Sequence, residues 1–356
     1  MKSIWSSRGD AFRCSRRWVP CAINCAMHRP PTVGIVTPAT PEANNGNWRT
    51  AVRWARMLAP QFRAQILQSW RGEPVDLLIA LHARRSAASI AAWAAARDAH
   101  RAGPLIVALT GTDLYRDIHH DESAQCSLQR ADALIVLQEC GADALPAALR
   151  ARTSVIYPSG EKRATLPKTS VRLRALMVGH LRDEKSPQTY FSAARLLRER
   201  HDILLDHIGA ALDTDLEREA RATMAECPAY RWLGALSHRE TLRRIQRAHV
   251  LVHPSRMEGG AHVILEAIRS GTPVLASDIP GNVGMLGRDY AGYFPVGDAA
   301  TLRNMLVRCR DEPEWLAERT REGLLRASRF EPDEERRRLR SLAAKCLQHR
   351  MEGNVS

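Results

Sequence analysis

Two glutamates eight positions apart form the pattern in this 356-residue chain that most clearly suggests chemistry. Glu258 and Glu266 enclose a glycine pair and an apolar run in the segment EGGAHVILE. A glycine pair lets backbone approach a ligand closely, and the exposed amides at a helix start can receive negative charge. Carboxylates accept hydrogen bonds from sugar and ribose hydroxyls. The pattern fits a nucleotide-sugar site, but Glu258 as a mere complement to a helix dipole, with Glu266 half exposed, explains it equally well.

The elements that must position these residues alternate between short apolar runs and helices. Such alternation predicts βαβ units and parallel sheets that are covered on both faces. The α/β chain is therefore expected to form two doubly wound, Rossmann-like domains that face each other across a cleft. The expected strands are 32–38, 75–81, 104–111, 131–138 and 153–160 in the first half, and 174–180, 202–210, 230–236, 249–255 and 272–278 in the second.

The expected domains span residues 31–165 and 166–329, with a polar linker over 161–170. Residues 330–356 read as a charged C-terminal helix whose arginine cluster is typical of a solvated face. Residues 1–30 read as a basic, poorly ordered arm, and Met27 is a possible true start. Cys21, Cys25 and His28 in the arm could bind a metal, but free thiols are the preferred interpretation without a fourth ligand nearby.

The composition limits the kind of partner. Lys and Arg number 52 against 39 Asp and Glu, so the chain carries +13 and attracts anions without specifying which. No apolar run reaches membrane-spanning length, so no stable membrane insertion is expected. The eight cysteines lack the spacing of a disulfide framework, which favours a reducing cytoplasm.

The stretch HPSRMEGGAHVILEAIRSGTPVLASDIPG resembles the signature of GT-B glycosyltransferases of the retaining-type family 4. The resemblance implies that Glu258 holds the donor sugar and Glu266 the ribose. Lys185, in VGHLRDEKS, is implied to contact the diphosphate and to form the catalytic group with Glu258. His180 stands where the family usually has arginine, so Arg182 is expected to supply the second cation. The other implied donor-binding residues are Gly259, Gly260, Ala261, His262, Leu233 and Gly234.

Three stretches of the first half, NNGNWRTAVRWARML, ALHARRSAASIAAW and ALTGTDLYRD, together resemble the selenosugar synthases of selenoneine biosynthesis. Those enzymes join selenophosphate to the sugar of a UDP-sugar and give a 1-selenosugar. The resemblance implies UDP-N-acetylglucosamine or UDP-glucose as donor and inversion at the anomeric carbon. No cofactor and no metal are expected.

The residue types in the first half suit a small dianionic acceptor. Arg49 and Arg84 each lie where the chain enters a helix after a strand, and arginine binds phosphate oxygens through two parallel hydrogen bonds. Solvent exposure of these arginines is an equally good interpretation. Thr110 stands where many relatives have a histidine, which is acceptable if the nucleophile arrives ionised. The candidate acceptor-binding residues are Asn45, Gly46, Asn47, Arg49, His82, Arg84, Arg85 and Asp113.

Two other functions stay open at this point. An ordinary family 4 transferase acting on a sugar or lipid hydroxyl would suit the basic balance and the tryptophan-bearing helices 48–58 and 90–98. A nucleic-acid binder would need a continuous basic face with interleaved aromatics, whereas aromatics are only 5% of this chain. The expected partners are therefore a UDP-sugar and selenophosphate, with no nucleic acid, while the sugar and the oligomeric state are left open. Asp213, in the DTD triplet, is expected to cap a helix rather than to bind metal, and Ser86 is expected to cap the helix that follows the strand at 75–81.

Overall fold

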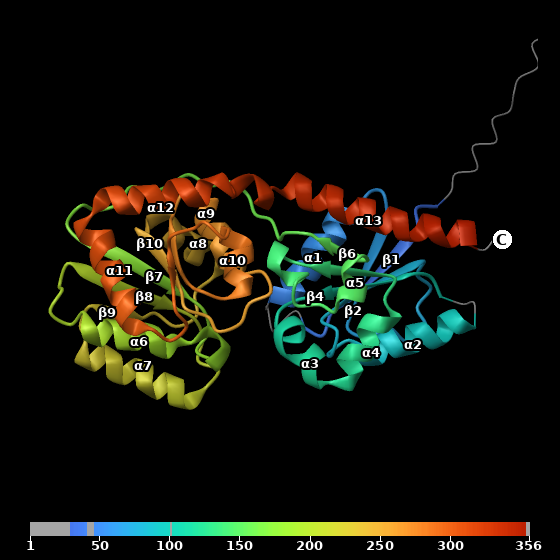
Figure 1. Ribbon diagram of the computed structural model, residues 1–356, viewed down its shortest axis with the longest axis horizontal. Helices are drawn as coiled ribbons and strands as arrows, with labels where there is room; N and C mark the ends of the chain where they lie inside the picture. The colour runs from blue at the N-terminus through green and yellow to red at the C-terminus, as the bar shows by residue number, and fades with distance from the viewer. Residues whose placement is uncertain (1–28, 41–45, 100–101, 354–356) are drawn as a thin grey trace, which may run out of the picture.

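Each half of the chain contains a six-stranded sheet in which every strand pair is parallel, as the computed structural model shows (Figure 1). The structure describes residues 29–40, 46–99 and 102–353, with side chains to residue 348. The N-terminal sheet has the order β2-β1-β3-β4-β5-β6, and the C-terminal sheet has the order β12-β11-β10-β7-β8-β9. In both sheets the chain starts inside and adds strands on either side, which confirms the expected pair of doubly wound units.

The strands of the N-terminal sheet are β1 (Thr32–Val36), β2 (Arg63–Leu67), β3 (Leu77–Leu81), β4 (Leu105–Leu109), β5 (Ala133–Val136) and β6 (Thr153–Val155). Those of the C-terminal sheet are β7 (Leu173–Val178), β8 (Ile203–Ile208), β9 (Tyr230–Trp232), β10 (Val250–His253), β11 (Val274–Ser277) and β12 (Tyr293–Phe294).

The α-helices are α1 (Gly46–Leu58), α2 (Ala87–Asp98), α3 (Ile118–His120), α4 (Glu122–Arg130), α5 (Ala147–Arg150), α6 (Pro187–Leu196), α7 (Thr214–Glu226), α8 (His238–Arg247), α9 (His262–Ile268), α10 (Pro280–Leu286), α11 (Ala299–Asp311), α12 (Pro313–Leu325) and α13 (Pro332–Gly353). Short helical turns add η1 (Asp113–Asp117), which is π-helical, and the 3-10 turns η2 (Glu139–Gly141), η3 (Asp183–Lys185) and η4 (Ala327–Phe330).

The central strands form because their sequences are continuous apolar runs that helices cover on both faces. Every residue of β3, LLIAL, and of β4, LIVAL, is buried. Trp93 of α2 and Leu128 of α4 pack on one face of the N-terminal sheet, and Trp54 of α1 packs on the other. Such burial stabilises each large side chain by about 1.5–3 kcal/mol.

Two strands were not predicted from the sequence, and both lie at sheet edges. The sequence of β2, RAQIL, has polar residues at its first and third positions, and its first residue is exposed. The strand β12 is only two residues long. An edge strand pairs on one side and faces water, so it needs little apolar sequence and gives a weak periodic signal.

Helix capping confirms one local prediction and corrects another. Asp213 accepts hydrogen bonds from the amides of Asp215 and Leu216, at 2.9 and 3.0 Å, and so caps α7 as expected. Ser86 does stand at the start of α2, but its hydroxyl makes no capping bond and instead donates to the Leu81 carbonyl at 2.6 Å. The prediction of a serine cap there was wrong, because the strand end that precedes the helix takes the hydroxyl.

The C-terminal helix α13 crosses from the second domain onto the first (Figure 1). Leu339 and Ala343, one helical turn apart, are fully buried in the core beside α1. Arg340 donates from Nε to the Met57 carbonyl at 2.7 Å, at the end of α1. The helix is charged, as predicted, but it is not only a solvated surface element, since it completes the N-terminal domain.

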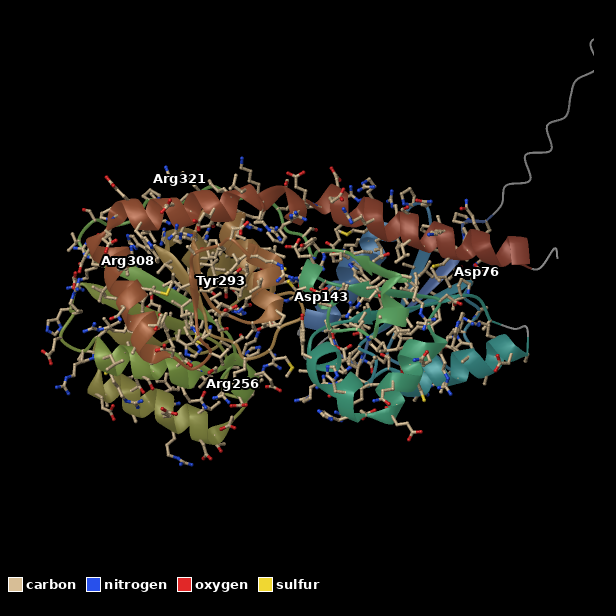
Figure 2. The ribbon with its side chains drawn as sticks, in the orientation of Figure 1. Asp76, Asp143, Arg256, Tyr293, Arg308 and Arg321 are labelled. Atoms are coloured by element: carbon tan, nitrogen blue, oxygen red, sulfur yellow. The ribbon has the colours of Figure 1, made fainter. Side chains whose placement is uncertain are left out.

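The two domains also touch directly at the cleft. The backbone of Gly259, in the second domain, lies so close to Thr110 and Gly111 of the first that an added Cβ would stand 2.6 Å from the Gly111 nitrogen. Asp143, which lies where the domains meet (Figure 2), forms an ion pair with Arg288 at 3.4 Å. The structure therefore has both domains in contact around the predicted donor loop.

Candidate active site

The loop between β10 and α9 carries Glu258 and packs it between two basic side chains. Lys185 forms an ion pair with Glu258 through Nζ, and the Nε2 atom of His253 lies 3.1 Å from the same carboxylate oxygen. Only 12% of the Glu258 side chain and 17% of the Lys185 side chain are exposed. The prediction that Glu258 and Lys185 lie together is thus confirmed, although they are 73 positions apart in the chain.

Burial and charge oppose each other at this carboxylate. Burial alone would raise the pKa of Glu258, but the Lys185 charge and the His253 contact outweigh it and hold that pKa below its usual range. Burial lowers the pKa of His253 although Glu258 favours its protonated form. The group at neutral pH is therefore a carboxylate, an ammonium and a neutral imidazole.

The lysine reaches Glu258 from the loop after β7. Gly179 directly follows that strand, and a Cβ there would touch the Lys185 stem at 3.4 Å. Burial, together with the charges of Arg182, Lys185 and Arg49, lowers the pKa of His180. His180 is consequently neutral at neutral pH and adds no cation, while its Nδ1 atom accepts a bond from the Ala210 amide at 3.0 Å.

Arg182, the second cation predicted for this loop, is partly exposed and lies near a carboxylate of the same loop. The Arg182 side chain is 45% exposed, and its Nε atom lies 3.9 Å from the Glu184 carboxylate. In contrast, the charge of Arg49 reaches both His180 and His262 and lowers the pKa of each. Arg49, which the sequence suggested for an acceptor, thus adds positive charge on the donor side from across the cleft.

Glu266 lies in α9 and is paired with His238 at the start of α8. The distance from His238 Nε2 to Glu266 Oε1 is 2.7 Å, and 17% of the Glu266 side chain is exposed. The carboxylate is therefore accessible at one edge and fixed by a side chain that can donate a hydrogen bond.

The segment after β9 shows why a glycine stands at position 234. Gly234 has φ = +68°, a left-handed conformation that favours glycine. Its carbonyl accepts from the Gly209 amide at 2.9 Å, and the Leu233 amide donates to the His207 carbonyl at 2.8 Å. These bonds hold the Leu233–Gly234 backbone against the end of β8, beside the donor loop.

The glycine pair serves domain contact as well as any approach to a ligand. An added Cβ on Gly259 would overlap the Thr110–Gly111 backbone, and one on Gly260 would stand 2.7 Å from the Leu137 Cβ. Ala261 follows as the buried residue before α9. The sequence explained the glycines by ligand approach alone, whereas in this structure they also let the donor loop pack on the first domain.

On the N-terminal side, His82 and Asp113 are buried rather than open to the cleft. Asp113 has no exposed surface and accepts bonds from the amides of Ala83, Thr110 and Gly111 at 2.9–3.0 Å. His82, with φ = +72°, lies 3.0 Å from the Thr112 hydroxyl. Both side chains fix the loops after β3 and β4. The direct acceptor contacts suggested for them stay a prediction.

Burial and the charge of Arg85 lower the pKa of His82, although Asp113 acts against them. A neutral His82 beside the Asp113 carboxylate can hold a fixed hydrogen-bonding tautomer. Its buried position, with 2% of the residue exposed, keeps it from contacting solvent directly.

Two arginines converge on one buried carboxylate at the rim of the cleft. Asp117, at the end of η1, accepts from Arg116 Nε at 3.1 Å and from Arg84 Nη1 at 3.4 Å. Arg116 also reaches across to Glu184 of the second domain at 3.7 Å. Arg84 is 49% exposed and also pairs with Asp121 at 3.3 Å. The sequence identified Arg84 but not Arg116, because only the π-helical turn aims the second arginine at the same carboxylate.

The remaining acceptor candidates have different surroundings. Arg85 and Gly46 are exposed, and Asn47 lies in the first turn of α1. Asn45 lies outside the described residues. Arg84 pairs with acidic groups of the first domain whereas Arg49 acts on histidines of the second, so the two arginines suggested as a pair have different neighbours.

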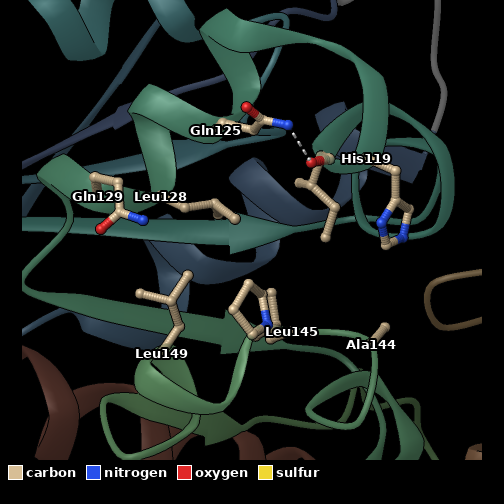
Figure 3. Close-up of a pocket in the computed structure, with 9 residues that line it drawn as sticks. His119, Gln125, Leu128, Gln129, Ala144, Leu145 and Leu149 are labelled. Atoms are coloured by element: carbon tan, nitrogen blue, oxygen red, sulfur yellow. Dashed lines mark hydrogen bonds between the residues drawn. The ribbon is translucent and has the colours of Figure 1, made fainter.

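A cavity of about 390 Å³ in the first domain is separate from this site (Figure 3). It lies between α3, α4 and the 144–149 segment, where Gln125 Nε2 donates to the Ile118 carbonyl at 3.1 Å. Its lining includes none of the candidate site residues.

Two further properties concern only the residues that the structure describes. Among them, no three His, Cys, Asp or Glu side chains are grouped so that they could hold a metal ion. Within the same ranges, every helix is too short or too polar to cross a bilayer. Cys21, Cys25 and His28, considered above as ligands, lie outside these ranges.

With this geometry in view, comparison with known proteins gives a consistent result. Residues 132–305 match the model of the family described as glycosyl transferases, group 1. This segment is similar to the group 1 glycosyltransferases. It contains β5 to β12 and the first half of α11, and hence Lys185, Glu258 and Glu266, whereas Arg49 and Arg84 precede it.

A curated relative of the chain is the glycogen synthase of Mycobacterium tuberculosis strain H37Rv. The two are 31% identical over 157 residues, which is 41% of this chain and 36% of the relative. The chain therefore spans little more than a third of the length of the curated relatives that it matches.

Solved structures extend the similarity to almost the whole chain. Anabaena HepE in complex with UDP and glucose aligns with a TM-score of 0.69 at 15% identity, over 90% of this chain and all of that one. Sucrose-phosphate synthase from Thermosynechococcus elongatus aligns with a TM-score of 0.71 at 16% identity and the same coverage. At such low identity the likeness concerns the fold, and it confirms the predicted GT-B architecture.

Proposed function

We propose that this chain is a glycosyltransferase that takes a sugar from a UDP-sugar and transfers it to selenophosphate. The observation that carries the donor half of the proposal is the Lys185–Glu258–His253 group, which is followed by the Gly259 backbone that lies against Thr110–Gly111 of the facing domain. A buried carboxylate that a lysine keeps ionised can accept hydrogen bonds from sugar hydroxyls.

The charges around the donor loop favour a diphosphate leaving group. Lys185 and Arg49 both act on the same histidines, so their positive charge converges beside the loop that starts α9. Fixed cations aimed at the oxygen that gains charge stabilise a transition state more than they stabilise the substrate. The UDP bound in the structure of HepE supports UDP as the nucleotide.

The acceptor half of the proposal rests on the arginines at the rim of the cleft. Arg84 and Arg116 share Asp117, and both keep nearly half of their side chains exposed toward solvent. Thr110, which touches Gly259, has no group that could act as a base near neutral pH. An acceptor that arrives ionised, such as selenophosphate, needs no base there, whereas a sugar hydroxyl does.

The proposed step balances without a cofactor. The selenium lone pair forms a bond to the anomeric carbon while the bond from that carbon to the β-phosphate oxygen breaks. UDP leaves with the electron pair, and its new charge is met by Lys185 and the loop amides. Hydrolysis of the Se–P bond by water then gives the selenosugar and phosphate.

Replacing Arg84 by alanine is expected to raise the KM for selenophosphate and to lower kcat/KM by tens to a few hundredfold. The reason is the loss of a charge-assisted hydrogen bond, about 2–3 kcal/mol. Lysine at this position should restore only part of the rate, since it keeps the charge but not the planar fork. Steady-state kinetics with acceptor varied at saturating UDP-sugar measure both effects.

The matched control for Arg84 is Arg130→Ala, which removes an exposed arginine from α4 of the same domain. Its kinetics should equal those of the wild type, and UDP affinity should be unchanged in both variants. An unchanged acceptor KM in Arg84→Ala would place the acceptor elsewhere or identify it as uncharged.

Replacing Glu266 by alanine is expected to weaken UDP binding by roughly 1.5–3 kcal/mol, because a charged acceptor for the ribose hydroxyls is lost. Glu314→Ala, in the exposed first turn of α12, is the control and should bind UDP normally. Calorimetric titration with UDP alone gives both affinities. If folded Glu266→Ala binds UDP as tightly as the wild type, Glu266 does not hold the ribose.

A further inference from the structure

His262, the first residue of α9, is tied to the opposite domain by a side-chain hydrogen bond. Its Nε2 atom lies 2.8 Å from Nη1 of Arg53, which belongs to α1. The two residues are 209 positions apart and meet where the donor loop packs on the first domain.

Arg53 is itself held rigidly by the helix that crosses between the domains. Glu335 of α13, 2% exposed, accepts from Arg53 Nε at 2.9 Å and from Arg53 Nη2 at 3.0 Å. The same carboxylate accepts from Trp54 Nε1 at 2.7 Å and from the Ser159 amide at 2.9 Å. The Ser159 hydroxyl donates to it as well, at 2.5 Å, and these five donors on one buried carboxylate fix the direction in which Arg53 presents its remaining nitrogen.

The contact with Arg53 determines where the His262 proton lies. A guanidinium group only donates, so His262 Nε2 must accept, and an accepting ring nitrogen carries no hydrogen. The proton of the neutral ring then sits on Nδ1. Burial, with the charges of Arg53, Arg49, His238 and Lys185, lowers the pKa of His262 to about 3, which keeps the ring neutral.

The Nδ1 atom of His262 is buried and has no hydrogen-bond partner among the described residues. Buried donors are nearly always satisfied in native proteins, so an unsatisfied one indicates a missing acceptor. Positive charge from Lys185 and Arg49 converges on the same ring, so an anionic oxygen is the acceptor that the surroundings favour.

We infer that the His262 Nδ1–H donates to a diphosphate oxygen of the bound nucleotide sugar, and that Glu335 and Arg53 set the tautomer that makes this possible. The inference rests on the proposed UDP-sugar function and extends it to the side chain of His262 within the glutamate motif and to Arg53 and Glu335 on two other helices. It makes the crossing helix α13 a part of the donor site, as a support that positions Arg53 rather than as a group that touches substrate.

The first test observes the tautomer directly. Nitrogen-15 NMR of the full-length protein with labelled histidine is expected to show His262 as a neutral ring with hydrogen on Nδ1 at pH 7. Adding UDP should shift the Nδ1 proton downfield. A ring with hydrogen on Nε2, or a charged ring, would overturn the inference without reference to activity.

The second test uses two amides that imitate one ring nitrogen each. In His262→Asn the amide nitrogen stands near the Nδ1 position, whereas in His262→Gln it stands near the Nε2 position. Calorimetry should show that UDP affinity falls less than about threefold in His262→Asn and about tenfold or more in His262→Gln. The difference corresponds to the one hydrogen bond to UDP that only the glutamine variant loses. Thermal melting checks that both variants fold.

The outcomes separate the inference from the function on which it rests. A wild type that binds UDP, with both variants equally affected or unaffected, would overturn the His262 contact and leave the proposed function standing. A wild type that does not bind UDP would overturn the proposed function and the contact with it.

Discussion

Replacing Gly259 by alanine is expected to lower kcat/KM by about 100-fold or more while each domain stays folded. The added Cβ would stand 2.6 Å from the Gly111 nitrogen and would overlap the Thr110 carbonyl group. Both partners are backbone, so no side-chain rotation relieves the clash, and the domains must separate. A displacement of about 1 Å between catalytic groups and substrate can cost about 100-fold in rate.

The control for this substitution is Gly323→Ala in α12, where the nearest atom to an added Cβ is Ile268 Cγ1 at an ordinary 3.6 Å. This variant should keep full activity. Steady-state kinetics and small-angle X-ray scattering measure rate and domain separation together. Full activity and an unchanged radius of gyration in Gly259→Ala would contradict the role of the close interdomain contact.

Replacing Lys185 by methionine is expected to lower kcat/KM by about 100- to 1,000-fold, as is typical when one electrostatic donor is lost from an active site. Methionine keeps most of the apolar stem that packs beside Gly179, so the change removes mainly the charge. Glu258 would then stay buried beside His253 alone, and its pKa would rise because burial opposes the ionised form.

The pH dependence of the free energy of unfolding tests the Lys185–Glu258 pair independently of activity. A carboxyl group whose folded pKa is depressed stabilises the fold above its unfolded pKa, about 4.3, and this contribution is lost as pH falls toward the folded value. The Lys185→Met variant should therefore lose less stability than the wild type on acidification below about pH 4.3. Chemical denaturation at a series of pH values measures this, with the exposed Lys162→Met as control. Equal slopes and equal rates in wild type and Lys185→Met would remove Lys185 from the site.

The sequence predicts the positions of the donor-side candidates on loop and helix because the signals for these positions are local. Glu258, the glycine pair and Glu266 lie in nine consecutive residues on one loop and helix, so strand–loop–helix order alone places them at a sheet edge. The buried strands likewise follow from continuous apolar runs such as LLIAL. The edge strand RAQIL lacks such a run and escapes prediction.

Apart from the Lys185–Glu258 pair, which the family resemblance implied, contacts between distant segments could not be predicted, because no periodic pattern links them. Glu335 meets Arg53 across 282 positions, and its burial depends on the path of α13 back to the first domain. The aim of Arg116 depends on a π-helical turn that the sequence does not indicate. Arg49 was predicted beside an acceptor, whereas its charge acts on His180 and His262, because the closeness of the two domains decides its neighbours.

The most direct test of the proposed function is mass spectrometry of reactions that contain the full-length chain, selenophosphate and one member of a panel of UDP-sugars. The account predicts one UDP released per sugar transferred, together with a product of the mass of a 1-selenosugar or its phosphorylated precursor. Sugar or lipid hydroxyl acceptors in place of selenophosphate should give no product. Transfer to a hydroxyl acceptor but not to selenium would contradict the acceptor assignment, and the absence of UDP release from every UDP-sugar would contradict the function itself.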